Sequence, residues 1–391
     1  MHKENMENEN LERRDFIKKG AAAVCCAGVA ALIGKVPRAF PRSPASPSGA
    51  VKGLVKPARS PWFEKLENRR VKCLLCPKKC ELSDGERSPC RVRENRGGEG
   101  YTLVFGNPAL IQEDPIERKP FFHVLPGSRA LSVSTAGCNL DCAFCEVWDM
   151  ALAEPEELYA YEMPPEKVAG HALSSGLRSV SYAFGEPVAF YEYMAETAAL
   201  VKKAGLLNLA HSAGFINPEP LKKLCGLLDA ANIDLKGFDP AFYRDFVGGE
   251  LDPVLESLKI LKRAGVHLEI TNIIIPTLND DMKLIESMSG WIADELGPDV
   301  PLHFSRFYPL YRLSSLPRTP VSTLNAARQT AMKAGLEYVY ISRVTGHDGE
   351  NTYCPGCGKV LIRRVGFVVD SMNIKNDRCP GCGRAVPGRW A

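Results

Sequence analysis

The 391-residue sequence carries little net charge and lacks a long hydrophobic run. The formal net charge of +3 argues neither for nor against nucleic acid binding, and we expect no nucleic acid partner. The uncharged run at residues 20–34 is too short to identify a membrane span. Cys25 and Cys26 within this run lack a convincing lipoprotein cleavage pattern around them. With 45% hydrophobic and 24% charged residues, the chain has an ordinary globular composition and room for one large domain plus small appendages.

Cysteine, in contrast, is abundant. There are 14 cysteines, and all but Cys225 fall into four groups, at residues 25–26, 73–90, 138–145 and 354–382. Such close, motif-like spacing argues against a disulfide framework and favours metal ligation by reduced thiols. Cys225 lies on the apolar face of the segment 221–228, and we predict that it is a core residue.

The group at the centre of the chain is Cys138, Cys142 and Cys145, which follows a strand-like run and the turn residue Gly137. Three thiolates on one short loop can hold three irons of a [4Fe–4S] cluster, since cluster iron is bound by cysteine thiolate. The missing fourth ligand leaves one iron open to a substrate or cofactor. A zinc knuckle or three unrelated thiols are the alternatives.

These three cysteines resemble the CxxxCxxC signature of the radical SAM superfamily, with Phe144 as the aromatic residue that usually precedes the last cysteine. From Val71 onward the chain resembles the radical SAM enzymes of the AmmeMemoRadiSam system, which are related to pyruvate formate-lyase (glycyl-radical) activating enzymes. The resemblance implies an iron–sulfur oxidoreductase that reductively cleaves S-adenosylmethionine (SAM). A 5′-deoxyadenosyl radical would then abstract hydrogen from a substrate, for which a glycyl radical on a protein is the candidate.

The resemblance also implies partners: SAM, an electron donor such as flavodoxin or ferredoxin, and a protein substrate or other AmmeMemoRadiSam components. Two alternatives from other classes stay open. One is an iron–sulfur electron carrier without SAM cleavage. The other is a metal-dependent scaffold in which the cluster is structural.

Six further residues resemble SAM contacts of this superfamily. Gly185, Glu186 and Pro187 look like the GGEP element that receives the SAM amine, although Phe184 replaces its first glycine. A glutamate and a proline at this place also make an ordinary helix start.

Asp234 and Lys236 resemble the DLK element of activating enzymes, in which the lysine would pair with the SAM carboxylate. A solvated lysine at a strand end is the alternative. His303 resembles the histidine of a late strand that approaches the SAM ribose.

Residues 131–344 alternate between strand-like and helical patterns. The strand-like runs are 131–135, 179–184, 208–212, 233–236, 267–275, 302–308 and 338–344, and the helical patterns include 190–204, 253–264, 281–296 and 324–334. Each of these helical patterns is followed by a glycine, the usual helix stop. Short strands alternating with helices predict an α/β fold with parallel strands, an open partial (β/α) barrel of six or seven strands. The cysteine loop follows the first strand, at the end where chemistry collects in barrels.

Two four-cysteine groups flank this core. Cys73, Cys76, Cys80 and Cys90 suffice for a closed site that holds either zinc or an auxiliary iron–sulfur cluster, and the sequence does not choose between them. Cys354, Cys357, Cys379 and Cys382 belong to two Cys-Pro-Gly-Cys-Gly units, and 21 residues separate the two cysteine pairs. This spacing predicts a zinc ribbon, with a rubredoxin-like iron site as the alternative.

We therefore expect a targeting-like leader (1–35), a flexible linker (36–61), an N-terminal cysteine-rich module (62–125), a radical SAM core (126–346) and a zinc-ribbon-like module (347–391). The linker assignment rests on the proline- and serine-rich composition of that segment. Arg13-Arg14 before the uncharged run resembles a twin-arginine signal. Because SAM and low-potential electrons are cytoplasmic supplies, we expect a cytoplasmic or membrane-associated protein, with twin-arginine export as the alternative.

Overall fold

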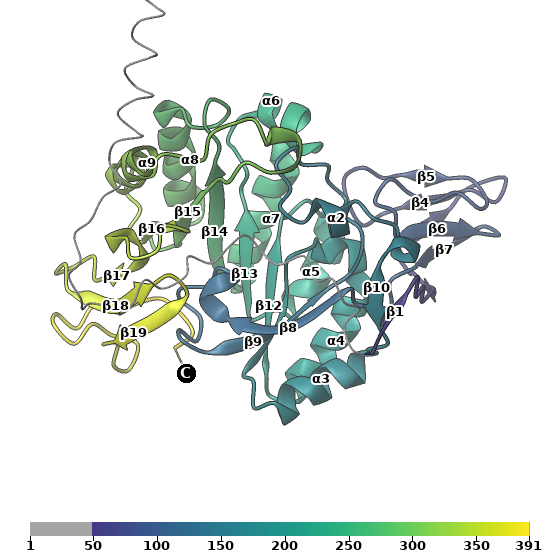
Figure 1. The fold of residues 1–391 in the computed structure, drawn as a ribbon, viewed down its shortest axis with the longest axis horizontal. Coiled ribbons are helices and arrows are strands. Elements are labelled where there is room, and N and C mark those ends of the chain that lie inside the picture. The colour runs from purple at the N-terminus through teal and green to yellow at the C-terminus, as the bar shows by residue number, and fades with distance from the viewer. Residues whose placement is uncertain (1–48, 391) are drawn as a thin grey trace, which may run out of the picture. The chain divides into compact units, whose positions relative to one another are not determined.

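The computed structural model describes residues 49–390, which belong to one compact unit. The expected leader and the first part of the expected linker lie outside these residues. The centre of the fold is an eight-stranded sheet (Figure 1). Its strands in spatial order are β16 (Val339–Ser342), β15 (Leu302–Arg306), β14 (His267–Ile274), β13 (Ala230–Asp234), β12 (Leu207–Ser212), β11 (Ser179–Tyr182), β9 (Arg129–Ser134) and β8 (Leu110–Pro115).

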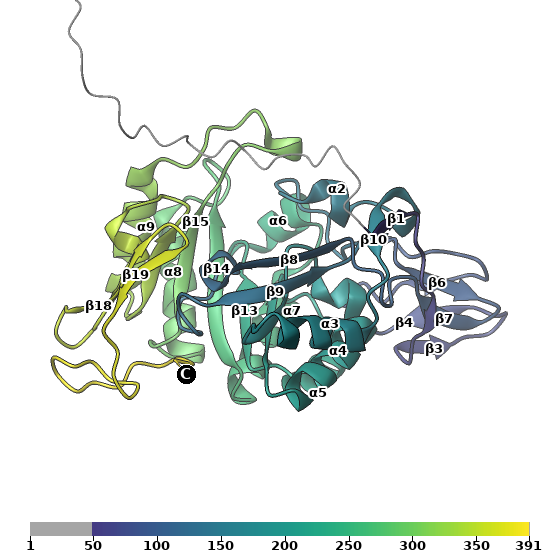
Figure 2. The ribbon, with the colours of Figure 1, turned by 60° about the horizontal axis from the view of Figure 1, so that its bottom comes forward.

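All seven strand-like runs of the sequence form strands of this sheet, and the pairs from β9 to β16 are parallel. β8 was not expected, and it pairs antiparallel with β9, as Figure 2 shows. The sheet stays open between β16 and β8, so the predicted partial barrel is confirmed. Because β8 belongs to this sheet, the core begins near residue 110 instead of residue 126.

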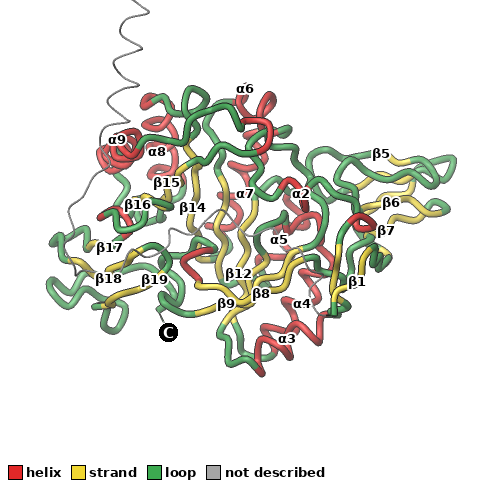
Figure 3. The backbone as a smooth tube through the Cα atoms, viewed as in Figure 1, coloured by secondary structure: helices red, strands yellow, loops and turns green. Residues whose placement is uncertain are grey.

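Helices connect the parallel strands (Figure 3). The longer ones are α3 (Pro165–Ser174), α4 (Tyr191–Lys203), α5 (Pro218–Cys225), α7 (Leu251–Arg263), α8 (Met282–Glu295) and α9 (Val321–Lys333). Shorter ones are α2 (Trp148–Ala151), α6 (Pro240–Phe242), the π-helix η4 (Tyr243–Val247) and the 3₁₀ turns η1 (Ile116–Arg118), η2 (Pro155–Glu157), η3 (Pro187–Phe190), η5 (Tyr311–Leu313) and η6 (Asp348–Glu350). The four predicted helices are present, and the glycine after each has a positive φ, which ends the helix without steric cost. Within the described part of the chain, no helix is long and apolar enough to cross a bilayer.

The N-terminal module consists of small antiparallel sheets. One contains β3 (Phe63–Lys65), β4 (Val71–Cys73) and β5 (Glu81–Leu82), and another contains β2 (Ala58–Arg59), β7 (Glu99–Thr102) and β6 (Arg93–Arg96). β1 (Ala50–Lys52) pairs with β10 (Tyr159–Tyr161). The expected flexible linker is wrong from residue 50 onward, because β1 and β2 of this segment pair with other strands. Backbone hydrogen bonds hold these short strands, so the segment needs no apolar core of its own.

The C-terminal module is a three-stranded antiparallel sheet of β17 (Thr352–Tyr353), β18 (Val360–Val365) and β19 (Val368–Met372), drawn in yellow in Figure 1. Its buried residues pack in one cluster with Phe122, Tyr338 and Tyr340 of the core. β18, the turn after it and β19 lie between the two pairs of cysteines in the sequence.

Candidate active site

The loop with three cysteines leaves the sheet after β9, as expected. Gly137 has a φ of +90°, and a Cβ at this position would lie 2.6 Å from the carbonyl oxygen of Cys90. Only glycine fits both constraints. The Asn139 side chain donates a hydrogen bond to the Phe215 carbonyl at 2.7 Å, which anchors the loop to the segment after β12.

The far side of the loop is held by backbone bonds from the π-helix η4. Asp141 and Ala143 donate their amides to the carbonyls of Val247 and Phe246, at 3.0 and 2.8 Å. A π-helix is rare and often marks a functional site. Gly248 ends this π-helix with a φ of +72°, and no other residue in the segment indicates it from sequence.

A later segment contacts the outer side of the loop. Arg312 donates its amide to the Ala143 carbonyl at 3.2 Å, and its guanidinium pairs with Asp141 at 3.0 Å. Next to it, the rings of Tyr311 and Trp148 stack with centroids 5.3 Å apart. Three segments distant in sequence therefore fix the conformation of one short loop.

The three thiols of the loop are free, and burial raises the pKa of each. For Cys142 the value rises to about 12, although the positive charge of Lys236 acts in the opposite direction. To hold a metal, these thiols would give up their protons and bind as thiolates.

The spacing of these thiols fits a cluster better than a single ion. Zinc with Zn–S bonds of about 2.3 Å would bring its sulfurs to about 3.8 Å from one another. Within residues 49–390, only the C-terminal cysteines place three or more candidate ligand atoms within 4.8 Å of one another. Cys138, Cys142 and Cys145 are spread more widely, as expected when each thiolate binds a different iron.

Glu186 follows β11 and is almost fully buried, with 4% exposure. Its carboxylate accepts hydrogen bonds from the Ser212 hydroxyl at 2.7 Å and from the Ala213 and Val188 amides at 2.8 and 3.1 Å. Burial raises the pKa of Glu186, and these donors act in the opposite direction. Glu186 also starts the 3₁₀ turn η3 with Pro187 in its first position, so the helix start that was the alternative interpretation is present.

Phe184 keeps the backbone conformation expected of the glycine it replaces. Its φ is +73°, a region that bulky residues rarely occupy. The Lys119 ammonium lies 4.3 Å from the centre of the Phe184 ring and pairs with Asp114 at 2.6 Å. The strained backbone is therefore retained, and a cation–π contact stabilises it. The next amide, that of Gly185, donates to the Ser134 hydroxyl at 2.9 Å.

Lys236 and Asp234 lie together at the C-terminal end of β13. The Lys236 ammonium is 2.9 Å from one Asp234 oxygen, and His211 at the end of β12 is 2.8 Å from the other. Burial opposes ionisation, yet Lys236 and His211 hold the pKa of Asp234 well below its usual range. The Lys236 ammonium also lies 5.8 Å from the centre of the Phe144 ring, so this ion pair faces the cysteine loop.

Sequence reasoning missed His211, Ser212 and Tyr243. Tyr243 accepts the Lys236 amide at 3.1 Å through its hydroxyl. His211 and Ser212 end a predicted strand beside the strand that ends with Asp234, and parallel neighbours end at the same edge of a sheet. The position of His211 and Ser212 at the end of this strand could therefore have predicted them as site residues, whereas no sequence pattern indicated Tyr243.

Two asparagines support the segment that carries Lys236. Asn272 donates to the Leu235 carbonyl at 2.7 Å, and Asn279 donates to the Lys236 carbonyl at 2.8 Å. Both line a small pocket with Gly237 and Phe238, and the side-chain oxygen of Asn272 is buried there without a hydrogen-bond partner. A ligand with a donor group could satisfy that oxygen.

His303 does not lie at this site, which corrects the expected contact with the SAM ribose. It is the second residue of β15, fully buried, and its Nε2 is 2.6 Å from Glu269. Glu269 also accepts the amides of Phe122 and His123. Strand alternation predicted the face on which His303 lies but not its depth along the barrel.

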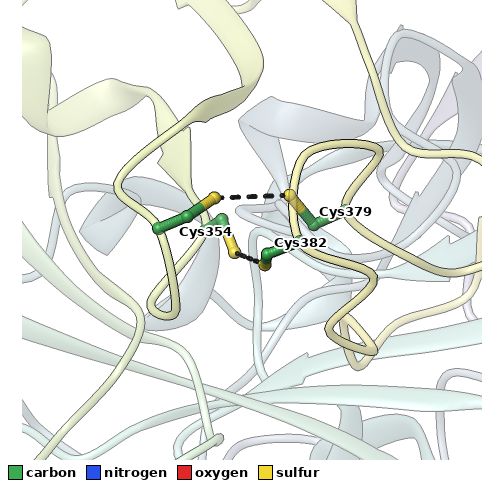
Figure 4. A group of neighbouring side chains, drawn as sticks. Cys354, Cys379 and Cys382 are labelled. Atoms are coloured by element: carbon green, nitrogen blue, oxygen red, sulfur yellow. Dashed lines mark hydrogen bonds between the residues drawn. The ribbon is translucent and has the colours of Figure 1, made fainter.

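The C-terminal cysteines form a compact group (Figure 4). The Sγ atoms of Cys354 and Cys382 are 3.5 Å apart, and those of Cys357 and Cys379 are 3.7 Å apart. Burial raises the pKa of the Cys379 thiol, but hydrogen bonds, led by those from the Cys382 and Gly381 amides, lower it to about 6. The arrangement suits one tetrahedral metal ion.

The comparisons with known proteins agree with this geometry. The model of the radical SAM superfamily matches residues 132–288, which contain the cysteine loop, Glu186 and Lys236. The chain belongs to the radical SAM superfamily. Members of this superfamily are enzymes, and the family implies a [4Fe–4S] cluster and SAM as cofactors.

Three relatives of this radical SAM enzyme differ in coverage. The uncharacterized protein MJ0808 of Methanocaldococcus jannaschii is 41% identical over 313 residues, 80% of this chain and 93% of that protein. The pyruvate formate-lyase-activating enzyme of Clostridium pasteurianum is 28% identical over 43% of this chain and 71% of that enzyme. The 7-carboxy-7-deazaguanine synthase of Thermococcus kodakarensis is 29% identical over 36% of this chain and 61% of that enzyme.

Proposed function

We propose that the protein binds a [4Fe–4S] cluster through Cys138, Cys142 and Cys145 and cleaves SAM reductively at this site. The observation that carries the proposal is the loop itself, which presents three widely spaced thiols at the C-terminal ends of the parallel strands. When bound, the cluster supplies one electron to SAM, which yields methionine and a 5′-deoxyadenosyl radical that abstracts hydrogen from the substrate.

The chain's own residues bind and orient SAM in this proposal. Glu186 supplies a buried carboxylate that attracts the amine of SAM, and Lys236 supplies a positive charge for its carboxylate. Asp234 neutralises part of that charge, and the ion pair holds Lys236 in one position. A side chain held in this way orients a ligand better than a free one. The buried surroundings also exclude water from a reactive radical.

The test is anaerobic reconstitution with iron and sulfide, followed by reduction in the presence of SAM. Methionine and 5′-deoxyadenosine are expected from the wild type, and neither from Cys142→Ala. Cys225→Ala is the matched control, because Cys225 is a half-buried cysteine on α5 outside the three metal-ligating groups. Absence of both products from the wild type would favour the electron carrier or the scaffold over SAM cleavage.

For the substrate we propose a glycine of a protein, as the resemblance to glycyl-radical activating enzymes implies; one relative is named as the activating enzyme of pyruvate formate-lyase, which is a protein. The reaction would then need two partners. One is a protein substrate, which would be one of the AmmeMemoRadiSam components, and the other is a one-electron donor of the flavodoxin or ferredoxin class. Incubation of the reduced enzyme, SAM and a candidate protein should give a glycyl-radical signal in electron paramagnetic resonance (EPR). Transfer of deuterium from a small molecule into 5′-deoxyadenosine, without any protein radical, would contradict this assignment.

A further inference from the structure

The N-terminal module holds a second group of four free thiols. Cys73 ends β4, Cys76 lies in the following turn, Cys80 precedes β5 and Cys90 lies in the turn before β6. The thiols of Cys73 and Cys90 are close enough to interact electrostatically with each other and with those of Cys76 and Cys80. The four therefore surround one place, although they come from separate turns.

The spacing of these four thiols differs from that of the C-terminal group. Among the described residues, no three of the N-terminal sulfurs lie within 4.8 Å of one another, whereas all four C-terminal sulfurs do. A single tetrahedral ion requires sulfurs about 3.8 Å apart. An iron–sulfur cluster separates its thiolates, because each binds a different iron. Within residues 49–390, neither the N-terminal group nor the loop at Cys138 places three sulfurs within 4.8 Å of one another.

A buried positive charge accompanies this group. Arg93 is 2% exposed, and its guanidinium pairs with Glu192 of α4 at 2.8 Å and with the Ser60 hydroxyl at 2.5 Å. Its charge also acts on the thiol of Cys73. A cluster with four thiolates carries net negative charge, and a fixed guanidinium in low dielectric stabilises such a charge.

The group also contacts the cysteine loop of the active site. The Cys90 carbonyl lies against Gly137, where a Cβ would be only 2.6 Å from its oxygen. From the segment after β12, Asn217 donates to the carbonyls of Leu74 and Cys76 at 2.7 and 3.1 Å. Gly137 is adjacent to Cys138, so the two groups of cysteines meet at this backbone contact.

We propose that Cys73, Cys76, Cys80 and Cys90 bind a second [4Fe–4S] cluster, coordinatively closed and docked against the active-site loop at Gly137. With four protein ligands this cluster has no open iron and does not bind SAM. It accepts one electron from an external donor of the flavodoxin or ferredoxin class and gives one electron to the active-site cluster. The donor is oxidised and the active-site cluster reduced, with no bond made or broken.

The first test is metal analysis of the full-length wild type after anaerobic reconstitution and gel filtration. Two clusters and one C-terminal zinc predict about eight irons and one zinc per chain. About four irons and two zincs per chain would overturn the proposal. This measurement needs no variant, so it stands even where substitutions in the module prevent folding.

The second test uses Cys73→Ala/Cys80→Ala, with Cys225→Ala as the control. The double variant should lose about half of the iron and none of the zinc. In EPR, the reduced wild type should give two signals, of which SAM changes one, and the double variant should keep only the SAM-sensitive signal. Loss of zinc with full retention of iron would contradict the second cluster.

The expected iron content rests in part on the proposed function of the Cys138 loop. The experiments distinguish failure of that function from failure of the N-terminal cluster proposal. If the Cys138 loop binds no cluster, no signal responds to SAM, yet Cys73→Ala/Cys80→Ala still removes iron. If the N-terminal cluster is absent, the SAM-sensitive signal is present in the wild type and unchanged in the double variant.

Discussion

The two four-cysteine groups have the same ligands but different surroundings. The C-terminal group forms two tight turns, with sulfurs 3.5 and 3.7 Å apart, in a module that packs on Phe122, Tyr338 and Tyr340. The N-terminal group is spread over separate turns and contacts the active-site loop. The number of cysteines alone therefore does not identify the metal. We propose that sulfur spacing distinguishes a single ion from a cluster, and that only the module in contact with the active-site loop acts on catalysis.

The largest effect is expected from Gly137→Ala, which acts at the contact between the N-terminal module and the active-site loop. Its Cβ would lie 2.6 Å from the Cys90 carbonyl in a backbone region that costs a non-glycine residue about 1–3 kcal/mol. Iron content and 5′-deoxyadenosine formation should both fall at least tenfold. Gly85→Ala is the control, because Gly85 has a φ of +81° but no atom within 4 Å of its Cβ position. Equal losses in both variants would show that backbone strain, not the contact, is responsible.

Lys236→Met should weaken SAM binding at least tenfold, which corresponds to about 1.4 kcal/mol. The substitution removes the charge proposed for the SAM carboxylate and leaves Asp234 paired with His211 alone. Lys236→Arg should recover part of the affinity. Lys222→Met removes an exposed lysine paired with Glu219 on α5 and serves as control. Equilibrium dialysis with labelled SAM measures each affinity, and unchanged binding by Lys236→Met would refute the proposed role.

Cys354→Ser/Cys379→Ser should act on stability alone. Loss of the C-terminal metal should lower the melting temperature of the module, because a structural metal contributes directly to folding free energy. SAM cleavage per folded, iron-loaded chain should stay within about twofold of the wild type. Zinc analysis, thermal unfolding and product assays on the same sample test this. A variant that keeps its iron but loses SAM cleavage would contradict the separation of the two modules.

A smaller, pH-dependent effect is expected where the C-terminal module meets the core. His123 contacts the Pro387 carbonyl and the Tyr340 hydroxyl, both at 2.6 Å, and burial lowers its pKa to about 3. Below about pH 6.5 the unfolded chain binds a proton that the folded chain does not, so stability falls as the pH drops. Between pH 7 and 5 the wild type should lose about 2 kcal/mol more than His123→Gln. Urea unfolding at both pH values measures this difference, and parallel losses would exclude His123 as the cause.

Much of the central sheet could be predicted because its signals are local. Apolar strands, helical patterns and the glycines that end the helices each depend on a few neighbouring residues, and all seven parallel strands were found. β8 was missed because its sequence, Leu110-Ile111-Gln112-Glu113-Asp114-Pro115, becomes polar along its length. β1 and β2 were missed because strands of two or three residues leave no periodicity to detect.

Site residues could be predicted where a local motif indicates the chemistry. They could not be predicted where their role depends on how deep they lie along a strand or on contacts with distant segments. The cysteine loop, Glu186, Asp234 and Lys236 lie at the C-terminal ends of their strands, as their sequence positions indicate. His303 lies near the start of its strand and belongs to a buried network. Alternation along a strand indicates the face on which a side chain lies but not its depth along the strand. The wide spacing of the N-terminal sulfurs depends on how separate turns pack together, so no pattern within 73–90 could have chosen between zinc and a cluster.

The central claim is that SAM binds to a cluster held by Cys138, Cys142 and Cys145. The most direct test is electron–nuclear double resonance on the reduced, reconstituted wild type with SAM labelled with ¹⁵N at its amine. We predict that one EPR signal changes on addition of SAM and shows coupling to the labelled nitrogen, and that both features are absent in Cys142→Ala. A wild-type cluster that is reduced and intact but shows no coupling to the SAM nitrogen would contradict the account.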